Sequence, residues 1–329
     1  MTRDSHRATI FGPHPILTVT VEASADGAQD EVHLHAGGQG VWVGRMVAEM
    51  GVEPVLCGFL GGEVGASLGP LLTALPGRRR LVPAAGNSGC CVMDRRSGER
   101  QAVAVAWTAP ASRHEIDDLF SITCAEALLS DVLVVCNPMS GNALPRGIYG
   151  DLIADVRANG TPVVVDLSSP RLDSALAGGP DLVKVNDWEL AEFVRGPVGE
   201  PPQRRAAVEK LRAAGARSVI VTRAAEPAYA VRADGEEFEL VPPRFDRGAR
   251  EGCGDAMTGA MAAGWALGLE AGRAHPRYGG GLGQLPTARV GDRLQGRGRR
   301  AGRPSARALR ASLTWPAEWP RWPGQVSGR

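Results

Sequence analysis

The stretch Gly252-Cys253-Gly254-Asp255 leads directly into a helical run of small residues, Ala-Met-Thr-Gly-Ala-Met-Ala-Ala-Gly, at positions 256–264. Glycines let the backbone turn and approach a ligand closely, and the amides of a first helical turn lack intrahelical partners. The helix dipole favours an anion at the same place, and the Asp255 carboxylate could take a proton from an alcohol there. The same residues also fit a plain loop with a helix cap. The stretch therefore predicts either an anion-binding catalytic turn or a structural one.

The sequence before this stretch alternates between apolar runs and helical patterns. Runs typical of buried strands cover residues 16–21, 54–59, 132–136, 162–167, 182–185 and 218–222. Helical patterns at 41–50, 149–158 and 204–214 each end near a glycine. This alternation predicts an α/β fold with a mostly parallel sheet flanked by helices. Residues 31–35 and 89–107 instead suggest antiparallel strands, which would form a small sheet that projects as a lid.

After Leu269 the alternation stops. Residues 271–329 carry 12 arginines and two acidic residues among many glycines and prolines, and only positions 306–313 have a helical pattern. Such a composition predicts a disordered tail. A nucleic-acid-binding arm is the alternative, but lysines and interleaved aromatic residues are absent, so we expect no nucleic-acid partner.

The composition excludes several classes of protein. The 329 residues suffice for one large domain or two smaller ones. The sequence contains no run of about 18 apolar residues, so we expect no membrane span. The first 15 residues lack the apolar core of a secretory signal. Six cysteines, at positions 57, 90, 91, 124, 136 and 253, show no metal-binding spacing. We therefore expect a cytoplasmic protein with reduced thiols and without zinc.

Two further motifs combine turns with polar groups. Ala-Gly-Gly-Gln-Gly at 36–40 follows a predicted strand and opens a helix. A dinucleotide-binding loop, close approach to a small ligand and a structural turn all fit it. Asp-Leu-Val-Lys-Val-Asn-Asp-Trp-Glu-Leu at 181–190 runs from a buried strand into a helix that starts near Asp187. Asn186 and Glu189 could bind a hydrated Mg²⁺ ion, or could form a reciprocal helix cap.

Together, Gly-Gly-x-Gly, Lys-x-Asn-x-x-Glu-Leu and Gly-x-Gly-Asp in this order resemble the PfkB/ribokinase family of carbohydrate kinases. The likeness is greatest to its 1-phosphofructokinase and tagatose-6-phosphate kinase branch, because Gly-Phe-Leu-Gly-Gly at 58–62 and Ala-Ser-Ala-Asp at 23–26 also resemble that branch. The resemblance covers residues 10–270. It implies a three-layer α/β/α sandwich with a β-sheet lid from residues 21–36 and 86–108. It also implies ATP-dependent phosphorylation of a sugar or sugar-phosphate hydroxyl, and a possible homodimer through the lid.

The resemblance also implies roles for particular residues. Asp255 would be the catalytic base, and Gly252, Cys253 and Gly254 would form the anion hole. The nucleotide would lie near Lys184, Asn186, Thr222 and Arg223, with Mg²⁺ near Asn186 and Glu189 through water. The sugar would contact Asp26, Gly37, Gly38 and Gln39.

The sequence departs from the family pattern at several positions. Gln39 stands where sugar-phosphate kinases carry Lys, Trp42 where an Asn contacts the substrate, and Gly-Asn-Ser-Gly-Cys at 86–90 lacks an Arg. Residues 221–227 also replace a glycine-bearing loop near the nucleotide. A kinase for an unphosphorylated sugar or polyol and a catalytically impaired ligand-binding relative remain alternatives. A dehydrogenase is a more distant one, which NAD(H) binding would test.

The tail suggests one more hypothesis. Permitted codons for residues 283–294, read one base later, can encode Ala-Asn-Phe-Leu-Pro-His-Gly-Leu-Gly-Thr-Gly, which resembles the family's ending. We therefore predict a shift of the reading frame between about residues 268 and 279. Sequencing the gene without finding such an alternative frame would contradict this hypothesis.

Overall fold

The computed structural model of the chain describes residues 5–24, 29–138, 144–241, 252–269 and 310–312. In this part of the chain a ten-stranded sheet has the order β14-β13-β12-β11-β10-β9-β8-β1-β4-β5. Its neighbours from β11 to β5 pair in parallel, and β12 and β13 continue the sheet as antiparallel strands. The strands are β1 (Arg7–Phe11), β4 (Glu53–Gly61), β5 (Arg78–Ala84), β8 (Val132–Cys136), β9 (Val163–Asp166), β10 (Leu182–Asn186), β11 (Ser218–Arg223), β12 (Glu226–Val231), β13 (Glu237–Val241) and β14 (Arg310–Ser312).

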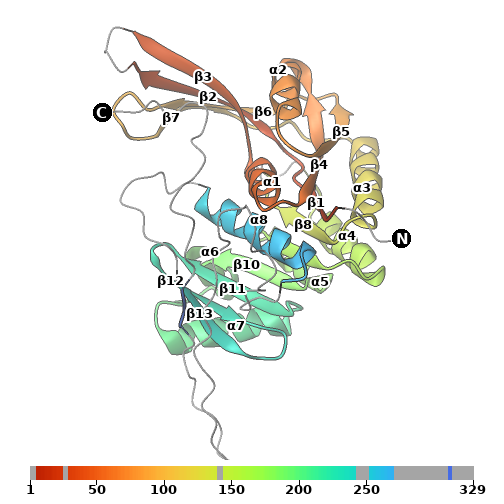
Figure 1. Cartoon of the computed structure of the whole chain (residues 1–329), viewed down its shortest axis with the longest axis vertical. Helices are drawn as coiled ribbons and strands as arrows, with labels where there is room; N and C mark the ends of the chain where they lie inside the picture. The colour runs from red at the N-terminus through yellow and green to blue at the C-terminus, as the bar shows by residue number, and fades with distance from the viewer. Residues whose placement is uncertain (1–4, 25–28, 139–143, 242–251, 270–309, 313–329) are drawn as a thin grey trace, which may run out of the picture.

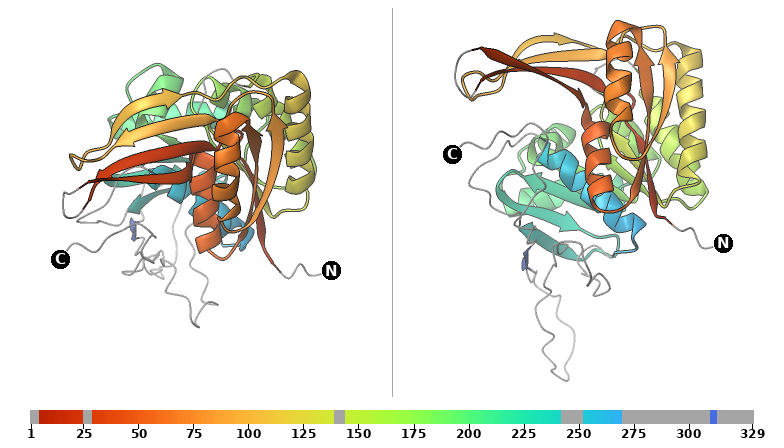
Figure 2. Two further views of the ribbon diagram at one scale, coloured as in Figure 1. Left: turned by 90° about the horizontal axis from the view of Figure 1, so that it is seen from above. Right: turned by 45° about the horizontal axis from the view of Figure 1, so that its top comes forward.

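Helices cover both faces of this sheet, as Figures 1 and 2 show. One face packs against α1 (Gln39–Glu49), α2 (Gly62–Thr73) and α8 (Cys253–Ala266). The other packs against α3 (Arg113–Ala127), α4 (Gly147–Ala158), α5 (Arg171–Ala177), α6 (Asp187–Val194) and α7 (Pro201–Ala213). Successive strand residues point to opposite faces, so Val164 joins the first core while Val163 and Val165 join the second. The predicted three-layer α/β/α architecture is confirmed.

The second sheet is the predicted lid, and it extends from one side of the molecule (Figure 2). It has the order β3-β2-β6-β7, with β2 (Ile16–Ala23), β3 (Asp30–Gly37), β6 (Gly89–Asp94) and β7 (Gln101–Ala106). The interpretation of residues 16–21 as a strand of the main sheet was wrong, because they belong to β2 of the lid. Its alternation of Val19 and Val21 with Thr18 and Thr20 is typical of a strand with two different faces.

The sequence patterns missed β1, which lies in the middle of the parallel sheet between β8 and β4. Its five residues begin with Arg7, and the next four are buried. The short run next to charged residues gave too little periodicity to identify a strand. Of the tail, only residues 310–312 are described, and they form strand β14 beside β13 rather than the expected helix. The other tail residues, with the predicted disorder and frame shift, lie outside the described residues.

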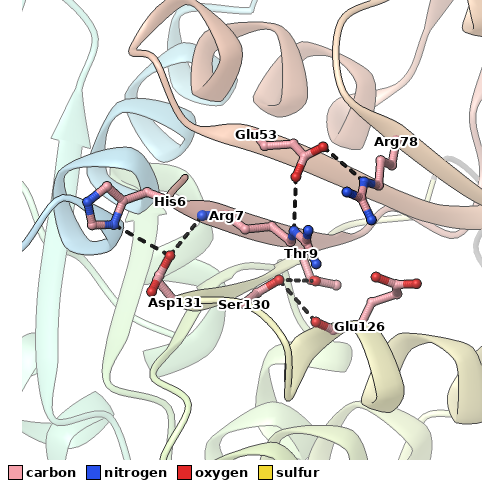
Figure 3. A network of polar contacts seen from close by, with 8 residues as sticks. All are labelled: His6, Arg7, Thr9, Glu53, Arg78, Glu126, Ser130 and Asp131. Carbon is pink, nitrogen blue, oxygen red and sulfur yellow. Dashed lines mark hydrogen bonds and ion pairs between the residues drawn. The ribbon is translucent and has the colours of Figure 1, made fainter. Parts of the chain in front are cut away.

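A polar network joins the amino ends of the central strands (Figure 3). Glu53 at the start of β4 accepts hydrogen bonds from Arg7 Nε at 3.0 Å and from Arg78 Nε at 2.9 Å. The backbone N–H of Arg7 donates to Asp131, which directly precedes β8, at 2.8 Å. Thr9 and Ser130 share a buried hydrogen bond of 2.8 Å. These hydrogen bonds join β4 to β1 and to β5, and β1 to the start of β8, and so help to hold the strands in register.

Candidate active site

The predicted catalytic residues meet at the carboxyl ends of the parallel strands, on the face covered by α8. Val183 and Val185 of β10 pack against the other helical layer, so Lys184 points toward α8. The same alternation in β9 directs Asp166 toward α8, because Val165 points away from it. The carboxyl edge of a parallel sheet is where α/β proteins bind ligands.

Asp255 lies in the first turn of α8. The turn begins at Gly252, whose φ of 80° is in the left-handed region, where residues other than glycine are strained. The N-cap position therefore contributes no capping side chain, and the first-turn amides of Cys253, Gly254 and Asp255 lie beyond the reach of the helical i→i−4 pattern. The predicted anion hole thus has the backbone geometry of a helix N-terminus, with a carboxylate beside it.

A buried ion pair supports this turn from below. Lys184 Nζ donates to Asp166 Oδ2 at 3.0 Å, and Thr258 Oγ1 of α8 donates to the same oxygen at 2.5 Å. A side chain at position 254 would place its Cβ only 2.9 Å from Lys184 Nζ, so Gly254 permits this close approach. Burial lowers the pKa of Lys184, but the charge of Asp166 outweighs it and the net pKa is raised. The ammonium group is therefore a fixed positive charge next to Gly254 in the predicted anion hole.

The environment of Asp255 raises the pKa of its carboxyl group. Burial, with the nearby charge of Asp166, raises the pKa of Asp255 from 3.8 to about 6. Lys184 and a hydrogen bond from Gln39 act in the opposite direction. A carboxylate with a pKa just below neutral is well suited to general base catalysis, because it is ionised at pH 7 yet still accepts a proton readily.

Asn186 and Glu189 form the reciprocal helix cap that the sequence offered as one alternative. Asn186 Oδ1 accepts the N–H of Glu189 at 2.9 Å, and Glu189 Oε2 accepts the N–H of Asn186 at 2.8 Å. Burial raises the pKa of Glu189. A carboxylate can accept several bonds, so the cap does not preclude a contact of Glu189 with a cation, and its metal role stays a prediction.

The glycine motif at 36–40 connects the lid to α1. Gly38 has a φ of 97° and caps α1, and a Cβ there would lie 2.9 Å from the carbonyl oxygen of His14. Gly37 ends β3 beside Thr18. Gln39 turns inward, and its Oε1 accepts the N–H of Asn137 at 2.5 Å. Because the preceding strand belongs to the lid, the motif is not the first turn of a dinucleotide-binding unit.

The remaining predicted residues differ in their distance from this cluster. Thr222 lies beside Asn186 in the register of β11 and β10, and its hydroxyl donates to the carbonyl of Val185 at 3.4 Å. Arg223 ends β11, where it donates to the carbonyl of Pro227 at 3.4 Å. Asp26 lies outside the described residues. The sugar and nucleotide roles of these three stay predictions.

Sequence analysis missed three residues of the site. Asp166 ends β9 after three buried valines, Asn137 directly follows the buried Cys136 at the end of β8, and Thr258 lies one turn after Asp255. A polar residue at the carboxyl end of an apolar strand was the available signal for the first two. Thr258 gave none, because a single threonine in a small-residue helix is unremarkable.

Residues 16–291 match the model of the pfkB family carbohydrate kinase. The chain belongs to this family. A 1-phosphofructokinase of Rhodobacter capsulatus is 30% identical over 264 residues, which cover 77% of this chain and 81% of that protein. A 1-phosphofructokinase of Haemophilus influenzae is 24% identical over 281 residues, covering 77% and 85% of the two chains.

Solved structures show the same fold as this PfkB kinase. Phosphofructokinase-2 from Escherichia coli, in a tetrameric inhibited form, superposes with a TM-score of 0.68 at 23% identity, covering 81% of this chain and 89% of that one. Ribokinase from Arabidopsis thaliana, complexed with ribose and ATP, gives a TM-score of 0.62 at 17% identity over 81% and 88%. The family establishes a phosphotransferase that acts on a hydroxyl group, so the dehydrogenase alternative is dropped.

Proposed function

We propose that this kinase transfers the γ-phosphoryl group of ATP to a hydroxyl of a sugar phosphate, with Asp255 as the base. The curated relatives named 1-phosphofructokinase support the substrate class. The observation that carries the proposal is a carboxylate with a pKa of about 6 in the first turn of α8, directly above the Lys184–Asp166 pair. Proton acceptor, amide donors and buried cation come together at one point.

The proposed reaction follows from this arrangement. Asp255 takes the proton of the sugar hydroxyl, whose oxygen forms a bond to the γ-phosphorus as the bond to the β–γ bridging oxygen breaks. The first-turn amides of α8 and the Lys184 ammonium stabilise the charge on the transferring group. Positioning and electrostatics supply most of the acceleration in such transfers. ADP and the phosphorylated sugar leave.

The donor set of the site fits Mg²⁺. Asp166, Glu189 and Asp255 supply hard carboxylate oxygens, and the charges of Asp166 and Glu189 both contribute to the raised pKa of Asp255. Within the described residues, no three acidic, His or Cys side chains are close enough to form a metal cage. Mg²⁺ usually keeps several waters and binds through one or two carboxylates plus the substrate's phosphates. Glu189 and Asn186 would hold it through water, where it would neutralise phosphate charge.

A kinase for an unphosphorylated sugar is the second candidate. It is favoured by one observation, the inward turn of Gln39 to Asn137, which leaves no cation at the position of the family's lysine. Measuring ADP release with fructose 1-phosphate, fructose 6-phosphate, fructose and ribose separates the two candidates. Preference for a free sugar would overturn the sugar-phosphate proposal.

The same assay tests the catalytic role of Asp255. Asp255→Asn is expected to lower kcat by about 100- to 10,000-fold, the usual contribution of a general base. Asp117→Asn is the matched control, since Asp117 lies on the surface of α3 and pairs with Arg113. Retained turnover in Asp255→Asn would refute the assignment of the base. Absence of turnover in the wild type with every sugar would favour the ligand-binding alternative.

We also propose that the kinase forms a homodimer through the apolar face of its lid. Val32 and Leu34 of β3 are 58% and 51% exposed, and they lie opposite Val21 and Val19 of β2. Val92 of β6 continues the same face next to Val19. A contiguous exposed apolar face usually marks an interface. Analytical ultracentrifugation should show a dimer that Val32→Glu/Leu34→Glu dissociates, whereas Leu129→Glu, on the exposed surface after α3, should leave it intact.

Membrane attachment through a spanning helix has no support in the described segments, since none of their helices combines the length and the apolar character that crossing a bilayer requires.

A further inference from the structure

A second set of polar groups lies near the carboxyl ends of β1 and β8 and takes no part in the proposed transfer. From β1 the chain continues through the lid to β4 on one side, whereas β8 lies on the other side of β1. The crevice at such a reversal of strand order is the preferred ligand site of open α/β sheets. His14, Asn137 and Arg171 lie near one another at this position.

We propose that Arg171 binds the phosphate group already present on the sugar substrate and so determines the preference for a phosphorylated sugar. This inference rests on the proposed kinase function, and it assigns a binding residue that neither motif nor resemblance identified. A planar guanidinium can donate two parallel hydrogen bonds to a phosphate, which makes arginine well suited to this task.

Arg171 lies close to the catalytic base through a short chain of hydrogen bonds. Its Nη1 donates to Asn137 Oδ1 at 3.4 Å, near the limit for such a bond. The N–H of Asn137 donates to Gln39 Oε1, and the Gln39 side chain donates to Asp255. Two neutral residues therefore separate the guanidinium from the carboxylate. In the proposed binding mode the sugar phosphate lies along this chain, with its hydroxyl at Asp255 and its phosphate at Arg171.

The neutral His14 ring next to Arg171 has capacity for a ligand. His14 is only 4% exposed, and neither ring nitrogen has a hydrogen-bond partner. A buried polar group without a partner is rare in folded proteins and points to a missing ligand or water. Burial, and then the charge of Arg171, lowers the pKa of His14 to about 4, so the imidazole is neutral and can both donate and accept. The ring is held by stacking on Phe59, at 5.9 Å between centroids.

The different partners of Lys184 and Arg171 at this edge support the assignment. Lys184 is already committed to Asp166 beneath the first turn of α8, where the transferred phosphoryl group would lie. Arg171 instead contacts the amide of Asn137 and influences the buried hydroxyl of Tyr149 in α4. The two cations thus serve two phosphates, one in transfer and one that identifies the substrate. This arrangement compensates for the neutral Gln39 in the glycine motif.

The test compares Arg171→Gln and Arg171→Lys with Arg113→Gln, a control at a surface arginine 87% exposed on α3. Arg171→Gln is expected to raise KM for fructose 1-phosphate by about 10- to 100-fold, the loss of a charge-assisted hydrogen bond, while KM values for ATP and fructose change less than twofold. Arg171→Lys should lie between wild type and Arg171→Gln. Equal changes with fructose and fructose 1-phosphate, or a change confined to ATP, would overturn the inference.

A binding measurement separates this inference from the catalytic proposal. Calorimetric titration of fructose 1-phosphate into Asp255→Asn reports recognition without turnover, and Arg171→Gln added to that variant should weaken binding about 10-fold or more. Unchanged affinity would refute the role of Arg171 even if the kinase activity is confirmed. If Arg171→Gln unfolds, the ratio of kcat/KM for phosphorylated over free sugar in Arg171→Lys decides, and an unchanged ratio contradicts the inference.

Discussion

Replacing Gln39 with leucine should move the pH dependence of catalysis. The Gln39 side chain donates a hydrogen bond to Asp255 and thereby lowers a pKa that burial and Asp166 raise to about 6. A hydrogen bond to a charged group is worth about 1.5–3 kcal/mol, and one pKa unit corresponds to about 1.4 kcal/mol. Its loss should therefore raise the pKa of Asp255 by about 1 to 2 units.

The sign of the effect follows from the role of the base. As the proposed base, Asp255 would have to be ionised to accept a proton, so kcat/KM is expected to fall as the pH drops through its pKa. In the wild type the acid limb should lie near pH 6. In Gln39→Leu it should lie near pH 7 or above, so that at pH 6 the variant retains only about a fifth or less of the wild-type ionised fraction. Well above pH 8 the two ionised fractions converge.

The assay is ADP release between pH 5 and 9, with the sugar below KM so that the profile reports the free enzyme. Gln203→Leu, in the first turn of α7, is the control and should leave the limb unchanged. An acid limb at the same pH in wild type and Gln39→Leu would refute the reasoning, because the hydrogen bond would then have no influence on the base. A wild-type limb below pH 5 would show that the base is not the buried Asp255.

Further predictions concern stability and reactivity. Because the folded-state pKa of Asp255 is raised, its contribution to stability is present below about pH 4 and is lost as the pH rises through 6. Asp255→Asn should therefore raise the free energy of unfolding at pH 8 by about 1–2 kcal/mol in denaturant titrations. A variant less stable than the wild type would contradict this sign. Cys253 is exposed in the predicted anion hole, whereas Cys57, Cys91 and Cys136 are buried, so iodoacetamide should inactivate the enzyme and ATP should protect it. Cys253→Ser should resist the reagent and keep its activity; continued inactivation would point to another thiol. Although partial burial opposes it, hydrogen bonds from Arg78 and Arg7 lower the pKa of Glu53, whose stabilisation is lost as the pH falls through that pKa. Glu53→Gln should therefore lower the free energy of unfolding by about 1 kcal/mol at pH 7 with kcat unchanged, and equal unfolding midpoints would refute a stabilising network.

The strand and helix patterns predicted most of the fold because the parallel strands are buried on both faces. Apolar runs such as residues 132–136 and 182–185 lie within β8 and β10 as expected. The lid strand β2 was misplaced because its alternation of valine and threonine was taken as a continuous apolar run. β1 was missed because five residues next to a charged terminus carry little periodic signal. Both failures concern strands whose position depends on tertiary contacts.

The site was predictable where one stretch carries several functional groups. Positions 252–255 contain the turn, the amides and the carboxylate together, so local sequence was sufficient. Asp166 could not be connected with Lys184 from sequence, since the pairing depends on which strands are neighbours and on which face each side chain occupies. The proposed role of Arg171 could not be inferred from the sequence for a similar reason. Arg171 becomes significant only beside Asn137 and His14, which follow β8 and β1 and are distant from it in sequence.

Cations outnumber the carboxylate around Glu53 at the amino edge of the central sheet, whereas carboxylates outnumber the cation in the carboxyl-edge cluster around Lys184. This contrast explains the direction of the pKa shifts. At the amino edge Glu53 has two arginine partners, and its pKa is lowered. At the carboxyl edge Asp166, Glu189 and Asp255 surround the single ammonium group of Lys184, and the pKa values of Glu189 and Asp255 are raised. Excess negative charge in a buried site is unfavourable until a cation arrives. A nucleotide bound with a divalent cation would supply that charge, so the imbalance that weakens the free enzyme favours binding of the substrate.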